Sequence, residues 1–175
     1  MRLKIAAALA ALLLFPTVTS AQEEMRAAPK CDAVAPPPPA LAGWSSKVDV
    51  AAAAKSDGLA AAGLTVNHAA TVALHPTREI SFITQPDKPG GSVAHGGLLA
   101  ISIDKPGTYQ VNLSTGAWID LVQDGKSVLS TAHAPGPACT GIRKMVQFPL
   151  QPGQYVLQIS ANADPTIAVM ISTVS

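Results

Sequence analysis

The stretch "GTYQVNLSTGAWIDLVQDGKSV", residues 107–128, contains the two signals that decide the fold. In residues 108–114 and 117–122, large apolar side chains alternate with polar or small ones, which is the pattern of strands that bury one face. Asp124-Gly125 follows the second segment, and this pair favours a tight type I′ turn because both central residues of such a turn have positive φ. The stretch therefore predicts short strands, with a hairpin between residues 117–122 and 126–131.

The same pattern covers most of the chain from about residue 69 onward. Turn signals such as Lys105-Pro106-Gly107 and Gln151-Pro152-Gly153 separate the strands, because proline fixes φ and glycine accepts the left-handed region. Short strands with one buried face each predict an all-β fold, namely an antiparallel, jelly-roll-like β-sandwich of about eight or nine strands, with a small barrel as the alternative. The predicted strands are residues 70–75, 79–84, 97–104, 108–114, 117–122, 126–131, 143–150, 154–161 and 166–173.

Four of these strands alternate cleanly enough to predict the hydrophobic core. In each of them, every second residue is large and apolar, so these side chains share one face. The predicted core residues are Leu99, Ile101, Ile103, Tyr109, Val111, Leu113, Tyr155, Leu157, Ile159, Ile167, Val169 and Ile171.

Residues 1–21 have the pattern of a secretory signal peptide. Arg2 and Lys4 precede an apolar run, and small residues follow it before Gln22. The run is shorter than the about 20 apolar residues that span a bilayer, and no later segment suits a membrane span. We therefore expect a periplasmic or secreted protein with a signal peptide (1–21), an extended proline-rich leader (22–40) and one β-sandwich domain (41–175). Within that domain, residues 41–64 predict loops with one helical turn near 51–54.

The net charge of the mature chain is close to zero. Removing residues 1–21 leaves ten lysines and arginines against eleven aspartates and glutamates. Such a balance does not favour nucleic acid or an anionic membrane surface. The expected partner is an unidentified small molecule, glycan or peptide.

Cys31 and Cys139 are the two cysteines of the chain. Two cysteines in an exported protein favour one disulfide, because the compartments outside the cytosol are oxidising. Such a bond would staple the N-terminal segment onto the domain. Metal ligation and free or intermolecular thiols are the alternatives.

A candidate binding surface involves Trp118, Asp120, His133 and Arg143. If Ile119 and its in-phase neighbours face the core, Trp118 and Asp120 point outward, and an exposed tryptophan beside an acid suits a sugar or a peptide. Alternatively, Trp118 covers the edge of the sandwich. His133 and Arg143 lie in "SVLSTAHAPGPACTGIRKM", residues 127–145, which is either a binding loop or a connector held by Cys139. Arg143 and Lys144 open the next strand, so one of the two faces out and the other is available to pair with Asp120.

The histidines supply the candidate metal ligands. His75, His95 and His133 are separated by 20 and 38 residues, which matches no metal motif. A sandwich could still gather them at one rim, and Glu79 could complete a site of two histidines and one carboxylate with His75. We expect no cofactor and no catalytic residue, with iron as the alternative cofactor.

Two resemblances add to these expectations. The phrases "GTYQVNLSTGAWIDLVQDGKSV" and "FPLQPGQYVLQIS" resemble secreted β-sandwich domains of the pre-peptidase C-terminal type, over roughly the last 80 residues. Domains of that type are non-catalytic accessories, some of which bind carbohydrate or polypeptide. Over most of the mature chain, "HPTREISF", "KPGGSVAHGGLL", "GAWIDLV" and "GPACTGIRKMVQFPLQPGQYVLQI" are similar to small exported bacterial proteins often labelled homogentisate 1,2-dioxygenase.

The second resemblance implies an iron-dependent enzyme. The dioxygenase of that label binds ferrous iron through two histidines and a glutamate, and no segment here matches that ligand motif, so the resemblance assigns no residue. Taken together, the sequence indicates an exported, non-catalytic β-sandwich that binds a ligand or associates with the cell envelope. A metal-dependent enzyme, most specifically an iron-dependent homogentisate 1,2-dioxygenase, is the alternative.

Overall fold

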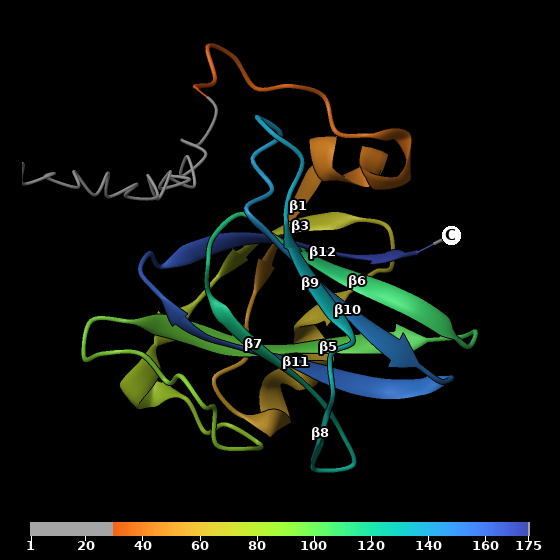
Figure 1. The fold of residues 1–175 in the computed structure, drawn as a ribbon. Helices are drawn as coiled ribbons and strands as arrows, with labels where there is room; N and C mark the ends of the chain where they lie inside the picture. Colours follow the sequence, from red (N-terminus) through yellow and green to blue (C-terminus); the bar gives the residue numbers. More distant parts are fainter. Residues whose placement is uncertain (1–29, 175) are drawn as a thin grey trace, which may run out of the picture.

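A computed structural model describes residues 30–174 and consists mainly of two six-stranded sheets packed as a sandwich (Figure 1). The first sheet has the order β1-β3-β12-β6-β10-β9, and the second has the order β2-β5-β11-β7-β8, with β4 pairing to β5. The elements of the first sheet are β1 (Lys47–Ala51), β3 (Ala69–Ala73), β6 (Gly107–Leu113), β9 (Ala132–Pro135), β10 (Lys144–Leu150) and β12 (Thr166–Thr173). Those of the second are β2 (Gly63–Leu64), β4 (His75–Pro76), β5 (His95–Ile103), β7 (Trp118–Gln123), β8 (Lys126–Val128) and β11 (Gly153–Asn162). Three short 3₁₀ helices accompany them, η1 (Pro39–Ser45), η2 (Ser56–Ala61) and η3 (Thr77–Glu79).

The predicted sandwich is correct, but the prediction of wholly antiparallel sheets is wrong. Strand β1 runs parallel to β3, and β2 runs parallel to β5, so both sheets are mixed. The described residues also form twelve strands instead of the eight or nine predicted. The additional strands are β1, β2, β4 and β9, in alanine-rich or proline-containing parts of the chain where no alternating pattern marks a strand, whereas the predicted strand at 79–84 does not form.

Two predicted segments differ from the structure for identifiable reasons. Residues 51–54 were expected to be helical, but Ala51 ends β1, because pairing with β3 outweighs the helical preference of alanine. The predicted strand at 79–84 is instead the end of η3 followed by a loop. The backbone amides of Ile83 and Thr84 in this loop bind the side chain of Gln158 on β11 instead of a neighbouring strand.

The predicted core is confirmed. All twelve of the predicted core residues are buried in one cluster between the two sheets. A second, smaller cluster lies on the outer face of the first sheet, where Trp44 of η1 packs with Ile142 and Met170. This second cluster attaches the N-terminal segment to the sandwich.

The predicted hairpin is also confirmed. Strands β7 and β8 pair up to Gln123 and Lys126, so Asp124 and Gly125 are the two residues of the loop. Their φ angles are 50° and 74°, the left-handed conformation that a type I′ turn requires at both positions.

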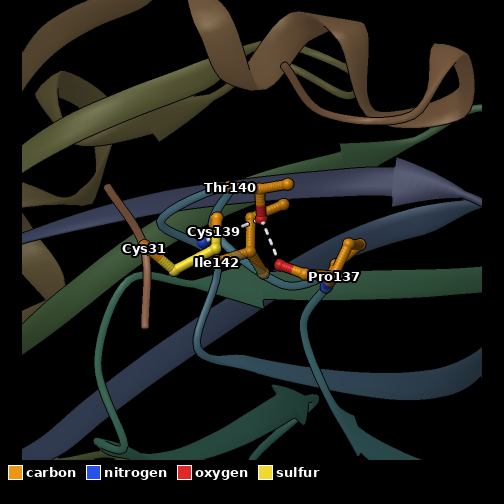
Figure 2. The surroundings of a disulfide bond; sticks show 5 residues. All are labelled: Cys31, Pro137, Cys139, Thr140 and Ile142. Atoms are coloured by element: carbon orange, nitrogen blue, oxygen red, sulfur yellow. Dashed lines mark hydrogen bonds between the residues drawn. A yellow bond between two sulfur atoms is a disulfide. The ribbon is translucent and has the colours of Figure 1, made fainter. Parts of the chain in front are cut away.

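A disulfide joins Cys31 to Cys139, as the cysteine arithmetic predicted, and the described residues contain no free cysteine (Figure 2). Cys139 lies in the loop between β9 and β10, which Thr140 stiffens by donating its hydroxyl to the carbonyl of Pro137 at 2.8 Å. The indole N–H of Trp44 donates to the Thr140 carbonyl at 3.1 Å. The disulfide and the loop that contains Cys139 therefore hold the N-terminal segment against the first sheet.

The predicted signal peptide, residues 1–21, and the first part of the leader lie outside the described residues. Within residues 30–174, no helix is long and apolar enough to cross a membrane.

Candidate ligand-binding site at the edge of the sandwich

A cavity of about 550 Å³ opens at the edge of the sandwich where the chain passes from one sheet to the other. Strand β8 ends the second sheet and β9 ends the first, and residues 129–131 connect them (Figure 1). The floor of this edge cavity is apolar, and its walls carry charged side chains. The floor consists of Ile119, Val128, Val146 and Phe148, and the walls include Asp87, Trp118, Asp120, His133 and Lys144.

Strand β7 brings Trp118 and Asp120 to the cavity. Ile119 and Leu121 are buried in the core, so Trp118 and Asp120 project from the opposite face, as predicted. Strand β8 pairs only with residues 121–123 of β7. The beginning of β7 pairs with β11 on one edge, and its other edge borders the cavity instead of a strand.

Asp120 is the central polar group of the edge cavity. Its Oδ1 accepts a hydrogen bond from the indole N–H of Trp118 at 3.1 Å. Its Oδ2 is buried and has no hydrogen-bond partner among the described residues; we call this atom the open oxygen. Burial raises the pKa of Asp120, and the charge of Asp87 raises it further, while the bond from Trp118 and the charge of Lys144 oppose this shift.

Lys144 faces Asp120 from the other sheet. It is in phase with Val146 and Phe148 on β10, so its side chain starts on the core side of the strand. Its Nζ donates to the carbonyl of Ala117 at 2.8 Å. Burial lowers the pKa of Lys144, the charge of Lys88 lowers it further, and Asp120 acts in the opposite direction.

Two lysines lie near the Trp118 ring, and neither forms an ion pair with another described residue. The Nζ atoms of Lys88 and Lys144 lie 5.1 and 5.6 Å from the centroid of the Trp118 ring, within the range of cation–π attraction. The one ion pair within residues 30–174 joins Arg78 and Glu79, neither of which lines the cavity. Asp120 and Lys144 thus influence each other's charge without touching.

A loop over the outer face of the second sheet carries Asp87, which lines the edge cavity, and Lys88, which lies beside the Trp118 ring. The Gln158 side chain accepts from the amides of Ile83 and Thr84 at 2.6 and 3.1 Å and donates to the Thr84 carbonyl at 3.1 Å. The hydroxyl of Ser160 donates to the carbonyl of Lys88 at 2.8 Å. Two buried polar residues of β11 therefore fix the position of this wall of the cavity.

The predicted binding surface is assembled in part. Trp118, Asp120 and His133 line the edge cavity, whereas Arg143 lies in a separate hollow beside Thr115 and Asn162. Arg143 directly precedes Lys144 on the chain, so the two side chains leave the backbone in opposite directions. Whether these residues bind a ligand stays a prediction.

The predicted surface named neither Lys88 nor Lys144, although one of Arg143 and Lys144 was expected to be available to Asp120. The phase of Lys144 with Val146 and Phe148 was a signal that could have identified it. Lys88 had no comparable signal, because its position depends on a loop held by residues some seventy positions away.

The candidate metal ligands do not form one group. His75 and His95 are on the paired strands β4 and β5, but His75 is opposite Gly96, so the two rings lie on opposite faces. His75 Nε2 is 2.8 Å from the Ala52 carbonyl oxygen. His95 has a buried Nδ1 without a partner among residues 30–174, and His133 lies at the edge cavity in the other sheet. Nowhere in the described part of the chain do three or more His, Cys, Asp or Glu side chains form a group that could hold a metal ion.

No protein-family model matches this chain, and a search of curated proteins finds no significant match. Function is therefore inferred from the geometry and the charges of the edge cavity.

The raised pKa of Asp120 predicts a pH-dependent difference in stability between the wild type and Asp120→Asn. As the pH rises above the ordinary value of 3.8, the unfolded wild type loses this proton before the folded wild type does, so folding becomes less favourable. The variant does not titrate at this position. Its stability relative to the wild type should increase with pH and level off above the raised pKa, by less than about 1 kcal/mol because water screens a half-exposed group. Urea denaturation between pH 3 and pH 7 tests this, and a difference that is constant or falls with pH would contradict it.

Proposed function

We propose that this protein is an exported, non-catalytic β-sandwich that binds a small molecule, glycan or peptide in the edge cavity. The open oxygen of Asp120 carries this proposal. A buried acceptor without a partner costs free energy, and such a group at a cavity is readily explained by a ligand that donates to it. The charges of Lys88 and Lys144 beside the Trp118 ring add donors for the same ligand.

Export is supported by two independent features. Residues 1–21 have the pattern of a signal peptide. The Cys31–Cys139 disulfide suits an oxidising compartment, such as the periplasm or the extracellular space. Association with the cell envelope and jelly-roll-like connectivity remain predictions. The resemblance to proteins labelled homogentisate 1,2-dioxygenase suggests an iron-dependent enzyme, but no observation on residues 30–174 favours that alternative.

Indole N–H signals in NMR spectra test the proposed function directly. The chain has two tryptophans, and Trp118 lies at the edge cavity, whereas Trp44 is buried in the second cluster. We expect at least one of cellobiose, glycyl-phenylalanine and phenyllactate to shift the Trp118 indole signal saturably, without moving that of Trp44. Asp120→Asn should weaken this binding by about tenfold, because it removes an acceptor from the site. If all three compounds leave the Trp118 signal in place at millimolar concentration, the proposed function is wrong.

A further inference from the structure

The apolar floor restricts the chemistry of a ligand for the edge cavity. Ile119, Val146 and Phe148 line it as part of the hydrophobic core, and Val128 packs against that core. Leu129 stands at the rim with 84% of its surface exposed. A ligand that enters the cavity gains by covering this surface with apolar atoms. A sugar, whose edges are lined with hydroxyl groups, would gain less from this apolar floor than a ligand with an apolar body.

The two lysines favour an anionic group on the ligand. Lys144 uses one of its three N–H donors on Ala117, and the described residues offer Lys88 no carboxylate within ion-pair distance. Burial lowers the pKa of Lys144, and the neighbouring charge of Lys88 lowers it further. A carboxylate between the two ammonium groups would compensate both charges.

Two acids also lie at the site. Asp120 and Asp87 repel an anion, so the carboxylate of a ligand is favoured next to the ammonium groups of the lysines and away from these two carboxylates. The open oxygen of Asp120 instead requires a hydroxyl or an N–H on the ligand. Asp120 and both ammonium groups lie around one indole ring, since Asp120 Oδ1 is 3.1 Å from the indole nitrogen and the two Nζ atoms are 5.1 and 5.6 Å from the ring centroid. A ligand that contacts this ring is therefore near all three groups.

We propose that the ligand of the edge cavity is a small amphiphilic organic acid. Its carboxylate lies between Lys88 and Lys144, a neighbouring hydroxyl or amino group donates to Asp120, and its apolar body covers Val146 and Phe148. This inference rests on the proposed function and names the ligand class for the same site.

Three matched compounds separate the contributions of charge, donor and apolar body. Phenyllactate has all three, 3-phenylpropanoate lacks the hydroxyl, and methyl phenyllactate lacks the charge. We expect phenyllactate to bind about tenfold more tightly than either of the others, as judged by titration of the Trp118 indole signal. Lys88→Gln and Lys144→Gln should each weaken phenyllactate binding by about tenfold. Lys126→Gln, which changes net charge equally at an exposed position outside the cavity, should leave it unchanged.

The Asp120→Asn variant tests the role of the open oxygen. Because asparagine Nδ2 donates where the carboxylate oxygen accepts, the preference for phenyllactate over 3-phenylpropanoate should fall from about tenfold to about one. Equal binding of the methyl ester would overturn the assignment of the lysines, and an unchanged preference in Asp120→Asn would overturn the assignment of the acid. Saturable binding of cellobiose or glycyl-phenylalanine without binding of phenyllactate would refute the organic-acid ligand but retain the proposed function. Failure of all these compounds would refute both.

Discussion

Replacing Cys31 and Cys139 together with alanine is expected to lower the free energy of unfolding by about 2–4 kcal/mol. The disulfide joins residues 108 positions apart, and closing so long a loop removes much of the entropy of the unfolded chain. The full entropic effect of a loop of this size would be about 5 kcal/mol. We expect less, because the segment around Cys31 is largely exposed and would gain freedom in the folded variant too. A backbone hydrogen bond from the amide of Ala35 to the carbonyl of Cys139 would still limit that freedom. Urea denaturation followed by circular dichroism measures this difference.

Reduction of the wild type provides the control for this prediction. If the covalent bond is responsible, dithiothreitol should shift the wild-type transition to that of the double variant and leave the variant unaffected. The indole N–H of Trp44 donates next to Cys139, so its NMR signal should move in the double variant, while that of Trp118 should not. A loss below about 0.5 kcal/mol would mean that the second cluster alone fixes the N-terminal segment.

The central strands were predictable because local pattern and final environment agree. In β5, β6, β11 and β12 the alternation in the sequence matches burial between two sheets. Strand β1 has no such agreement. Its residues are mostly exposed, and its partner β3 becomes a neighbour only when about twenty intervening residues fold back to form a parallel pair. The conformational preferences of the β1 residues alone therefore do not predict that pairing.

The same distinction applies to the edge cavity. Alternation along β7 was sufficient to predict that Trp118 and Asp120 share a face opposite to Ile119. Whether Arg143 or Lys144 lies near Asp120 could also be predicted, because the phase of β10 places Lys144 on the same side as Val146 and Phe148. Lys88, in contrast, reaches Trp118 because β11 holds its loop across the second sheet, and that arrangement is a property of the tertiary structure.

Gln158 links the stability of the fold to the edge cavity, and its replacement should affect both. Only 1% of its surface is exposed, and its amide satisfies the amides of Ile83 and Thr84 and the carbonyl of Thr84. Gln158→Met fills a similar volume but offers none of these hydrogen bonds. Either three partly buried backbone groups lose their hydrogen-bond partner or the loop detaches, so we expect a loss of about 2–3 kcal/mol in the free energy of unfolding.

Gln154→Ala is the matched control, because Gln154 is on the same strand and face but is exposed, with a single side-chain hydrogen bond to Ser102. That variant should change stability by less than about 0.5 kcal/mol. Hydrogen exchange distinguishes the two responses of the loop, since the amides of Ile83 and Thr84 should lose protection in Gln158→Met if the loop detaches and keep it if the loop stays in place. In the first case Lys88 loses its fixed position, and phenyllactate binding should weaken about as much as in Lys88→Gln. A detached loop with undiminished phenyllactate binding would show that Lys88 is not part of the site, whatever the effect on stability.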